Sequence, residues 1–400
     1  MEELTRALED VVRREKGRVV GGLVRALGSL DAAEDAFQEA VLAALPNWRA
    51  NGAPVNPAAW LTTAAKNHAR DALRHQRIRD KTAPLLVENE AVTDTLDSIA
   101  DDELRLVFTC CHPVLTLDSQ VALTLKVVAG FTTDEIARAF LAPEKTIAQR
   151  ITRAKLKIEE EKLAYEVPER PELEGRLAAV LAVVYLVFNE GHTAREGPLM
   201  RLDLQAEAMH LARELCDLLP NEAEVFGLYA LIAFSYARAA TRVDADGVMV
   251  LLEDQDRARW DRRVIKEGLM ALQRARRFPG GAYTLQAEIA ACHATAETWA
   301  ATDWQRILAL YDELVAVAPS PIVSLNRAVA LSMRVGPLEA MSVLAEVESA
   351  LSGYHLFHAV RADFRSRLGQ NAHDDLTRAL ALCGNDAERK LLQKKIDRAM

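Results

Sequence analysis

Six residues near the middle of the chain have side chains that can contact DNA from one face of a helix. Arginine and glutamine can form paired hydrogen bonds with guanine and adenine in the major groove, whereas lysine and threonine more often hold phosphates. The six are Lys145, Thr146, Gln149, Arg150, Arg153 and Lys157. A solvated basic face would have the same composition, so this stripe alone leaves both interpretations open.

The residues around this stripe predict three helices. An apolar helix from Ser119 should end at Gly130, and Thr132 with Glu135 forms a capping box for a short helix that follows. Pro143 suits the first turn of the next helix, because its missing N–H costs nothing there. Apolar residues of that helix recur at helical spacing and should face the other two helices: Ile147, Ile151, Ala154 and Ile158. This outline is that of a helix-turn-helix.

A second basic stripe lies upstream, on a helix predicted from Ala58 to Lys81. Clustered positive charge of this kind binds phosphates and releases their counterions. Asn67 could bond to single-stranded bases and Trp60 could stack on them, although core packing is the use of Trp60 that we favour. The residues assigned to nucleic-acid contact here are Trp60, Lys66, Asn67, Arg70, Arg74 and Arg77.

An acidic amphipathic helix precedes this basic one, from Asp31 to Leu45. Its alanines can pack inward, and Asp35, Gln38, Glu39 and Leu42 form a mostly polar stripe that by itself may be read as solvated. Prolines and a glycine from Pro46 onward predict a loop. Further upstream the pattern is helical from Glu2, with Gly21 and Gly22 expected to interrupt one helix.

The composition is that of an ordinary globular protein. The 400 residues include 50% hydrophobic ones, which is enough for two or three packed domains. A formal net charge of -9 argues against a protein that coats nucleic acid indiscriminately, so DNA contact must come from local basic patches. Five scattered cysteines and no secretory signal or membrane-spanning run predict a cytoplasmic protein without disulfides.

The order of these pieces resembles a bacterial extracytoplasmic-function (ECF) sigma factor of RNA polymerase. The resemblance rests on DAAEDAFQEAVLAAL, a loop, W-L-x-x-x-A-x-N with a basic tail, a linker and a helix-turn-helix, and it covers about residues 2–160. It implies an all-α fold with a sigma region 2 domain (1–81), an acidic linker (82–103) and a sigma region 4 domain (104–162).

The resemblance also implies the partners. Asp35, Gln38, Glu39 and Leu42 would dock on the β′ clamp helices of core RNA polymerase, and the β flap would be a further contact. Asn67, Arg70 and Arg74 would lie at the melted −10 element of promoter DNA, and the helix-turn-helix would read the −35 element. The linker carries Glu88, Glu90, Asp94, Asp97, Asp101, Asp102 and Glu103, and may be either solvated or threaded through the polymerase.

The segment VFTCCHP offers Cys110, Cys111 and His112 for a metal, but adjacent residues on one helix cannot easily ligate one ion. We expect small buried side chains there, and no metal or cofactor. The same segment, with IAQRITRAKLKI, resembles one ECF branch that carries a large C-terminal extension. Here the extension is expected to be helical at 172–300, followed by helix pairs resembling tetratricopeptide (TPR) repeats at 301–400.

Two features of the extension could have a binding function. Asn189, Glu190, His192 and Asp203 could line a pocket with Arg242, Glu253 and Asp254, but a helix C-cap with Gly191 in the left-handed region is the interpretation we favour. The repeats would offer a concave surface for a protein partner, a plain bundle being the alternative. His355 and His358 are expected to lack carboxylate partners at metal spacing.

The sequence therefore predicts a non-enzymatic sigma factor that is regulated by its own extension. A one-component repressor or activator that senses a ligand is the alternative, but it leaves the acidic helix and the upstream basic stripe unexplained. A scaffold or enzyme localised by its N-terminal third is a third possibility. Target promoters, the inducing signal and the direction of regulation do not follow from the sequence.

Overall fold

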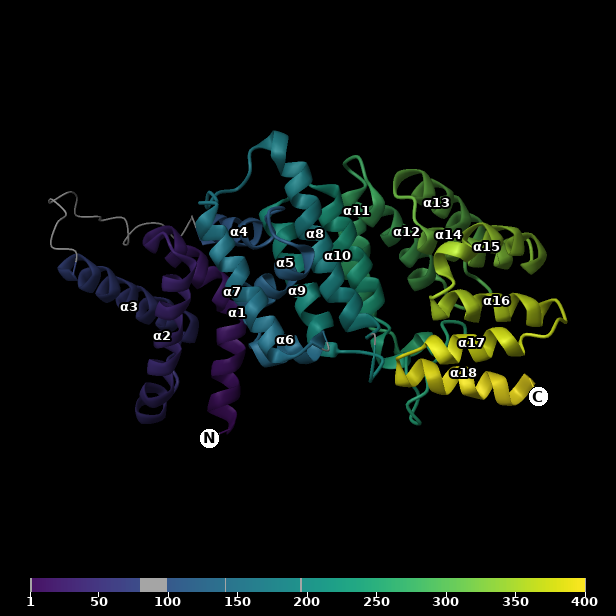
Figure 1. Ribbon diagram of the computed structural model, residues 1–400, viewed down its shortest axis with the longest axis horizontal. Coiled ribbons are helices and arrows are strands. Elements are labelled where there is room, and N and C mark those ends of the chain that lie inside the picture. Colours follow the sequence, from purple (N-terminus) through teal and green to yellow (C-terminus); the bar gives the residue numbers. More distant parts are fainter. Residues whose placement is uncertain (1, 80–98, 141, 195, 400) are drawn as a thin grey trace. The chain divides into compact units, whose positions relative to one another are not determined.

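The computed structural model describes residues 2–79, 99–140, 142–194 and 196–399, and these form helices with two isolated β-bridges (Figure 1). They divide into two compact units, Met1–Leu186 and Val187–Met400. The predicted all-α fold is confirmed. The boundary between the units falls inside one helix, α8 (Arg170–His192).

The first unit begins with three helices that pack on one another: α1 (Glu2–Leu27), α2 (Leu30–Asn51) and α3 (Pro57–Arg79). Ser29 starts α2, because its hydroxyl accepts a hydrogen bond from the N–H of Ala32 (3.3 Å). The predicted loop is present, but it begins at Gly52 and not at Pro46, because α2 continues through this proline to Asn51. Trp48, only 2% exposed, packs in a cluster with Leu8 and Leu61 and so holds the last turn in place despite the missing N–H of the proline.

The glycines of α1 serve close packing and do not interrupt the helix. A Cβ atom at Gly21 would lie 2.8 Å from the carbonyl oxygen of Asp102 on α4 (Ile99–Cys110). Glycine therefore lets the two helix backbones approach. Because α4 begins at Ile99, Asp102 and Glu103 belong to a helix and are buried, which corrects their expected place in a solvated linker.

The rest of this unit is α5 (Leu117–Val127), α6 (Thr133–Ala139), α7 (Glu144–Glu160) and the first part of α8. Tyr165, between α7 and α8, has its hydroxyl 2.8 Å from the carbonyl oxygen of Gly21 and 2.6 Å from that of Asp102. Arg176 of α8 donates to the carbonyl oxygen of Phe108 (2.9 Å). These bonds fasten the segment after α7 to α1 and α4.

A buried ionic cluster joins α2 to three other helices. The carboxylate of Glu34 on α2 lies 2.9 Å from Nζ of Lys16 on α1 and 2.7 Å from Nζ of Lys155 on α7. Lys16 also donates to the carbonyl oxygen of Lys126 on α5 (2.7 Å), and Lys155 pairs with Asp31 (2.6 Å). Burial opposes the charge on Glu34, but the two lysines outweigh it and hold its pKa below the ordinary value of 4.5.

The second unit is built around α10 (Ala223–Tyr236), which packs against α9 (Leu202–Leu218), α11 (Arg262–Ala275) and α12 (Ala282–Thr295). The helix α10 is apolar on nearly all sides, as expected for a helix that is covered by neighbours all round. Two short 3₁₀ helices, η3 (Ala239–Thr241) and η4 (Arg257–Arg259), flank the long connection to α11.

The last hundred residues form consecutive helices, each packed on the next. They are α13 (Trp304–Val317), α14 (Pro321–Arg334), α15 (Pro337–Leu351), α16 (His355–Arg367), α17 (His373–Leu382) and α18 (Asp386–Ala399). Pro321 opens α14, with Ser320 as its N-cap. In addition α14 touches α16, as expected when one helix pair stacks on the next.

Across the described ranges, no helix combines the length and the apolar character that crossing a membrane requires.

We predict that Glu34→Gln loosens the first unit selectively. The substitution leaves Lys16 buried without its counter-charge, which costs about 3 kcal/mol and corresponds to roughly hundredfold faster amide exchange where the unit opens as a whole. Hydrogen exchange followed by mass spectrometry on peptides from α1, α2 and α7 measures this, with peptides from α13 to α18 as the internal reference.

Asp35→Asn is the matched control, because Asp35 is the next residue on α2 and is exposed. It should leave exchange in α1, α2 and α7 unchanged. Since the pKa of Glu34 is depressed, its contribution is complete above about pH 4.5 and is lost as the pH falls through its folded pKa. Equal exchange in the two variants at pH 7 would contradict the role of the cluster.

Candidate nucleic-acid interface

The helix-turn-helix has the local structure that its sequence predicts. Glu135 N–H donates to the hydroxyl of Thr132 (3.1 Å), and Thr132 N–H donates to the carboxylate of Glu135 (2.7 Å). The capping box is therefore confirmed. Gly130 ends the preceding helix region with φ of 75°. Pro143 is the N-cap of α7 and not its first helical residue.

One face of α7 is fixed by packing. Ile147, Ile151 and Ala154 are buried, as expected, and Ile158 is half-buried near the end of the helix. Lys155 is used inside the unit, where it pairs with Asp31 and Glu34. The spacing of Lys155 from the apolar residues did not predict these ion pairs, because both partners are more than a hundred residues away in the sequence.

The opposite face of α7 is open to solvent. Lys145, Gln149 and Arg153 are exposed, whereas Thr146, Arg150 and Lys157 are half-buried. Arg150 pairs with Asp118 at the start of α5 (3.1 Å), and Lys157 pairs with Glu161. Ion pairs this exposed contribute little, so phosphates or base edges can replace the carboxylates at small cost. The structure thus brings all six predicted residues together on one accessible stripe.

The second basic stripe lies on α3. Asn67, Arg70 and Arg74 are exposed, and Lys66 is half-buried. Arg70 donates to the side-chain oxygen of Asn67 (3.3 Å), so these two side chains already share one polar patch. The side chain of Arg77 and residues 80–98, including Glu88, Glu90, Asp94 and Asp97 of the predicted linker, lie outside the described residues.

Trp60, at the start of α3, packs as we favoured from the sequence. Its ring meets that of Trp48 edge-on, with the ring centres 5.7 Å apart. It remains half-buried, so one side of the indole is accessible beside the loop that joins α2 to α3.

The acidic stripe of α2 faces away from the ionic cluster. Glu34 is buried, but Asp35, Gln38 and Glu39 are exposed, and Leu42 is 62% exposed. One side of α2 therefore packs inside the unit, and the other side is exposed to solvent.

Cys110 and Cys111 are buried, as expected. Burial raises the pKa of the Cys111 thiol to about 12, and its sulfur lies 3.4 Å from the hydroxyl of Thr124. The Nδ1 atom of His112 accepts a hydrogen bond from the N–H of Val114 (3.2 Å). These residues serve packing and turn formation.

In the second unit, the predicted helix C-cap at Gly191 is wrong. The helix α8 continues to His192, and Gly191 does not have a positive φ. A Cβ atom at Gly191 would lie 2.6 Å from the backbone nitrogen of Gln205 on α9. Glycine is needed here because two helix backbones meet, and the side-chain amide Nε2 of Gln205 donates to the carbonyl oxygen of Gly191 (2.8 Å).

The pocket considered around this segment is only partly assembled. Glu190 is buried 4.0 Å from Arg201, and Arg242 donates to the carbonyl oxygen of His192. Asn189 is half-buried, whereas Asp203, Glu253 and Asp254 are exposed. Burial, followed by the charge of Arg242, lowers the pKa of His192 well below its ordinary value. Three of the seven residues considered, Asp203, Glu253 and Asp254, are thus exposed, and Arg242 is bonded to the backbone.

The expectation that His355 and His358 lack carboxylate partners is wrong. His355 lies 3.2 Å from Glu388, and His358 lies 3.8 Å from Asp375. The ligand atoms of His355, Cys383 and Glu388 lie within 4.8 Å of one another, so within the described ranges these three could hold a metal ion. His355 is on α16, 33 residues before Glu388 of α18, so folding brings it to Cys383 and Glu388, which are close in sequence.

Comparison with known families locates three regions of this chain. Residues 11–78 match Sigma-70 region 2, residues 105–158 match Sigma-70 region 4, and residues 176–276 match a family of unknown function (DUF6596). The uncharacterized protein R00370 of Rhizobium meliloti (strain 1021) is 42% identical over 392 residues, which cover 95% of this chain and 93% of that protein. No solved structure matches.

We predict that Gly191→Ala destabilises the protein by about 1–3 kcal/mol, although alanine is the better helix former, because the added methyl group collides with the backbone of α9. Gly175→Ala on the same helix is the control. A Cβ atom there meets nothing within 4 Å, so this change should stabilise the helix by about 0.5–1 kcal/mol. Thermal unfolding of both variants measures the difference, and a stable Gly191→Ala protein would contradict the close packing.

Proposed function

The chain belongs to the sigma-70 family as an ECF sigma factor with a C-terminal extension, and we propose that it directs promoter-specific transcription under control of that extension. Sigma factors act by binding core RNA polymerase and promoter DNA, so no catalytic residue is assigned. The proposed place of action is the cytoplasm, where bacterial RNA polymerase lies.

The single observation that carries the docking proposal is the division of α2 into two faces. Glu34 and the alanines are buried, while Asp35, Gln38, Glu39 and Leu42 remain in solvent. In this family the acidic helix docks on the β′ clamp helices, and an exposed acidic stripe with one apolar contact supports that role here. The β flap is proposed as the further contact of region 4.

The two basic stripes support separate tasks on the promoter. The stripe on α7 includes arginine and glutamine side chains that can reach base edges in the −35 duplex. The stripe on α3 combines Asn67 with Arg70 and Arg74. These residues suit hydrogen bonding to bases and electrostatic contact with phosphates in the melted −10 strand. Trp60 can add a stacking surface at the end of the same helix.

The extension is proposed to regulate these contacts in cis. The relative in Rhizobium meliloti aligns over 93% of its own length, so the sigma regions and the extension occur together in both chains. Consecutive helix pairs from α13 to α18 offer a surface of the kind that binds peptides or proteins, and we propose a protein partner there.

Run-off transcription with core polymerase tests the function. The protein should give transcripts only when core polymerase is added, and the double variant Asp35→Ala/Gln38→Ala should lose at least tenfold through weaker polymerase binding, which a pull-down measures. Glu144→Ala, at another exposed acidic position on the surface of the first unit, is the control. Tight, specific duplex binding without polymerase would favour a one-component repressor or activator instead.

The two basic stripes should respond differently to substitution. Replacing Arg150 by alanine should change the preferred −35 sequence, since one good base contact discriminates by about 1–3 kcal/mol. Replacing Arg74 by alanine should leave that preference intact but slow open-complex formation and reduce its salt dependence. Transcription from a library of promoter variants separates the two effects, and an equal loss at every promoter for Arg150→Ala would overturn the base-reading role.

A further inference from the structure

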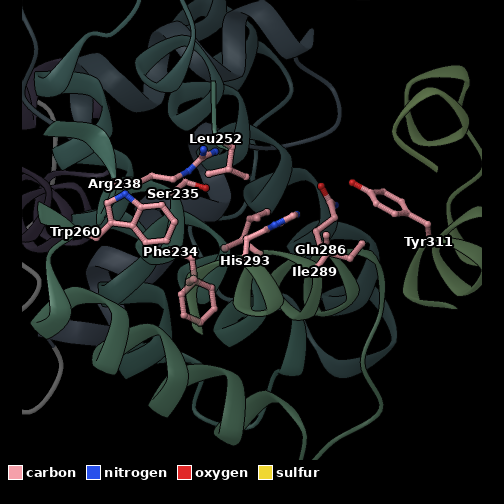
Figure 2. Close-up of a pocket in the computed structure, with 12 residues that line it drawn as sticks. Phe234, Ser235, Arg238, Leu252, Trp260, Gln286, Ile289, His293 and Tyr311 are labelled. Atoms are coloured by element: carbon pink, nitrogen blue, oxygen red, sulfur yellow. The ribbon is translucent and has the colours of Figure 1, made fainter. Parts of the chain in front are cut away.

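A cavity of about 270 Å³ lies in the second unit (Figure 2). The end of α10, the loops around η3 and η4, the helix α12 and Tyr311 of α13 form its walls. Its apolar lining includes Phe234, Trp260 and Ile289. Its volume is just below the range of about 300–1,000 Å³ that is common for ligand pockets, so a ligand here must be small.

The charge in this cavity is positive and uncompensated. Arg238 lines the wall, and within the described part of the chain no carboxylate pairs with its guanidinium. Burial, and then the nearby charge of Arg257, lowers the pKa of Arg238 to about 10. Arg238 is half-buried, and an arginine partly removed from water is normally paired with a carboxylate because desolvation of an unpaired charge is costly.

The neighbouring groups do not supply the missing negative charge. Arg257 donates to the carbonyl oxygens of His293 (2.6 Å) and Ala296 (2.9 Å), and its second terminal nitrogen is buried without a partner in the described structure. Nδ1 of His293 is buried and unpartnered as well. Burial, with Arg238 and Arg257, lowers the pKa of His293 to about 4, so this ring is neutral at pH 7. Arg238 and His293 therefore both line a cavity whose described lining residues include no acidic side chain.

The walls are rigid enough to hold this arrangement without a ligand. Trp260 is 3% exposed, and its indole N–H donates to the hydroxyl of Thr241 (3.0 Å). The guanidinium of Arg257 lies over the same indole, 4.7 Å from the ring centre. On the other side His293 meets Trp304 edge-on and stacks with Trp299. The cavity is therefore framed by fixed aromatic rings.

We propose that this cavity binds a small organic anion, with its carboxylate on Arg238 and its apolar or aromatic body against Phe234, Trp260 and Ile289. A carboxylate fits the planar fork of a guanidinium and can accept two hydrogen bonds from it. The apolar walls distinguish such a ligand from inorganic phosphate, which would leave them unfilled. Gln286 and Tyr311 also line the cavity, as Figure 2 shows.

Isothermal titration of the full-length protein with benzoate tests the proposal, with benzamide as the uncharged analogue and inorganic phosphate as the anion without an apolar body. Benzoate should bind, and benzamide should bind roughly tenfold to hundredfold more weakly because it lacks the charge-assisted hydrogen bonds. Arg238→Met should reduce benzoate affinity by a similar factor. The same change should raise the melting temperature of the free protein, because it removes the repulsion with Arg257.

Arg263→Met is the matched control, since the side chain of Arg263 on α11 is 81% exposed. It should leave benzoate affinity unchanged. If Arg238→Met does not fold, Arg238→Lys is the second variant. It keeps the positive charge but lacks the planar guanidinium, and it should still weaken benzoate binding.

Absence of benzoate binding at millimolar concentration, equal binding of benzoate and benzamide, or unchanged affinity in Arg238→Met would each overturn the proposal. Preference for phosphate over benzoate would overturn the assignment to an organic anion. These titrations contain neither polymerase nor DNA, so their result is independent of the transcription experiments.

Discussion

The first unit depends on one buried carboxylate. Glu34 is out of contact with water, so its charge is tolerated only because Lys16 and Lys155 reach it from two other helices. An arrangement of this kind has little freedom, since moving either helix by a few ångströms would leave a charge uncompensated. The helix α7, with its proposed base-reading stripe, is therefore fixed against α2, with its proposed docking stripe.

This constraint divides the charged residues of the unit into two groups. Those in the cluster are shielded from water and strongly coupled, and they hold helices together. Those on the stripes of α3 and α7 are exposed, and their ion pairs, such as Arg150 with Asp118, are weak because water and salt screen them. Binding to DNA or polymerase can therefore replace the ion pairs of the stripes without disturbing the ion pairs of the buried cluster.

The second unit handles buried charge in a different way. Arg242 and Arg257 are largely satisfied by backbone carbonyl oxygens, which fix their positions without neutralising them. Arg238 lacks even that compensation among the described residues, and it faces a cavity. In the first unit the buried charges neutralise one another, whereas in the second unit no carboxylate among the described residues pairs with Arg238.

The sequence by itself determined the features that depend on neighbours along the chain. Thr132 and Glu135 are three residues apart, so their reciprocal cap follows from local geometry alone. The apolar spacing of Ile147, Ile151 and Ala154 likewise fixed which face of α7 is buried and which carries the polar stripe. The order of acidic helix, basic helix and helix-turn-helix was sufficient to identify the family.

Tertiary structure decided what depends on contacts between distant segments. Pro46 and Gly191 read locally as helix ends, but packing of Trp48 and close approach of α9 carry both helices past them. No local pattern joins Lys155 to Glu34, His355 to Glu388, or Arg238 to His293, because their spacing in the chain is far longer than a helical turn. Electrostatic energy depends on distance through space and on burial, and only the folded chain defines either.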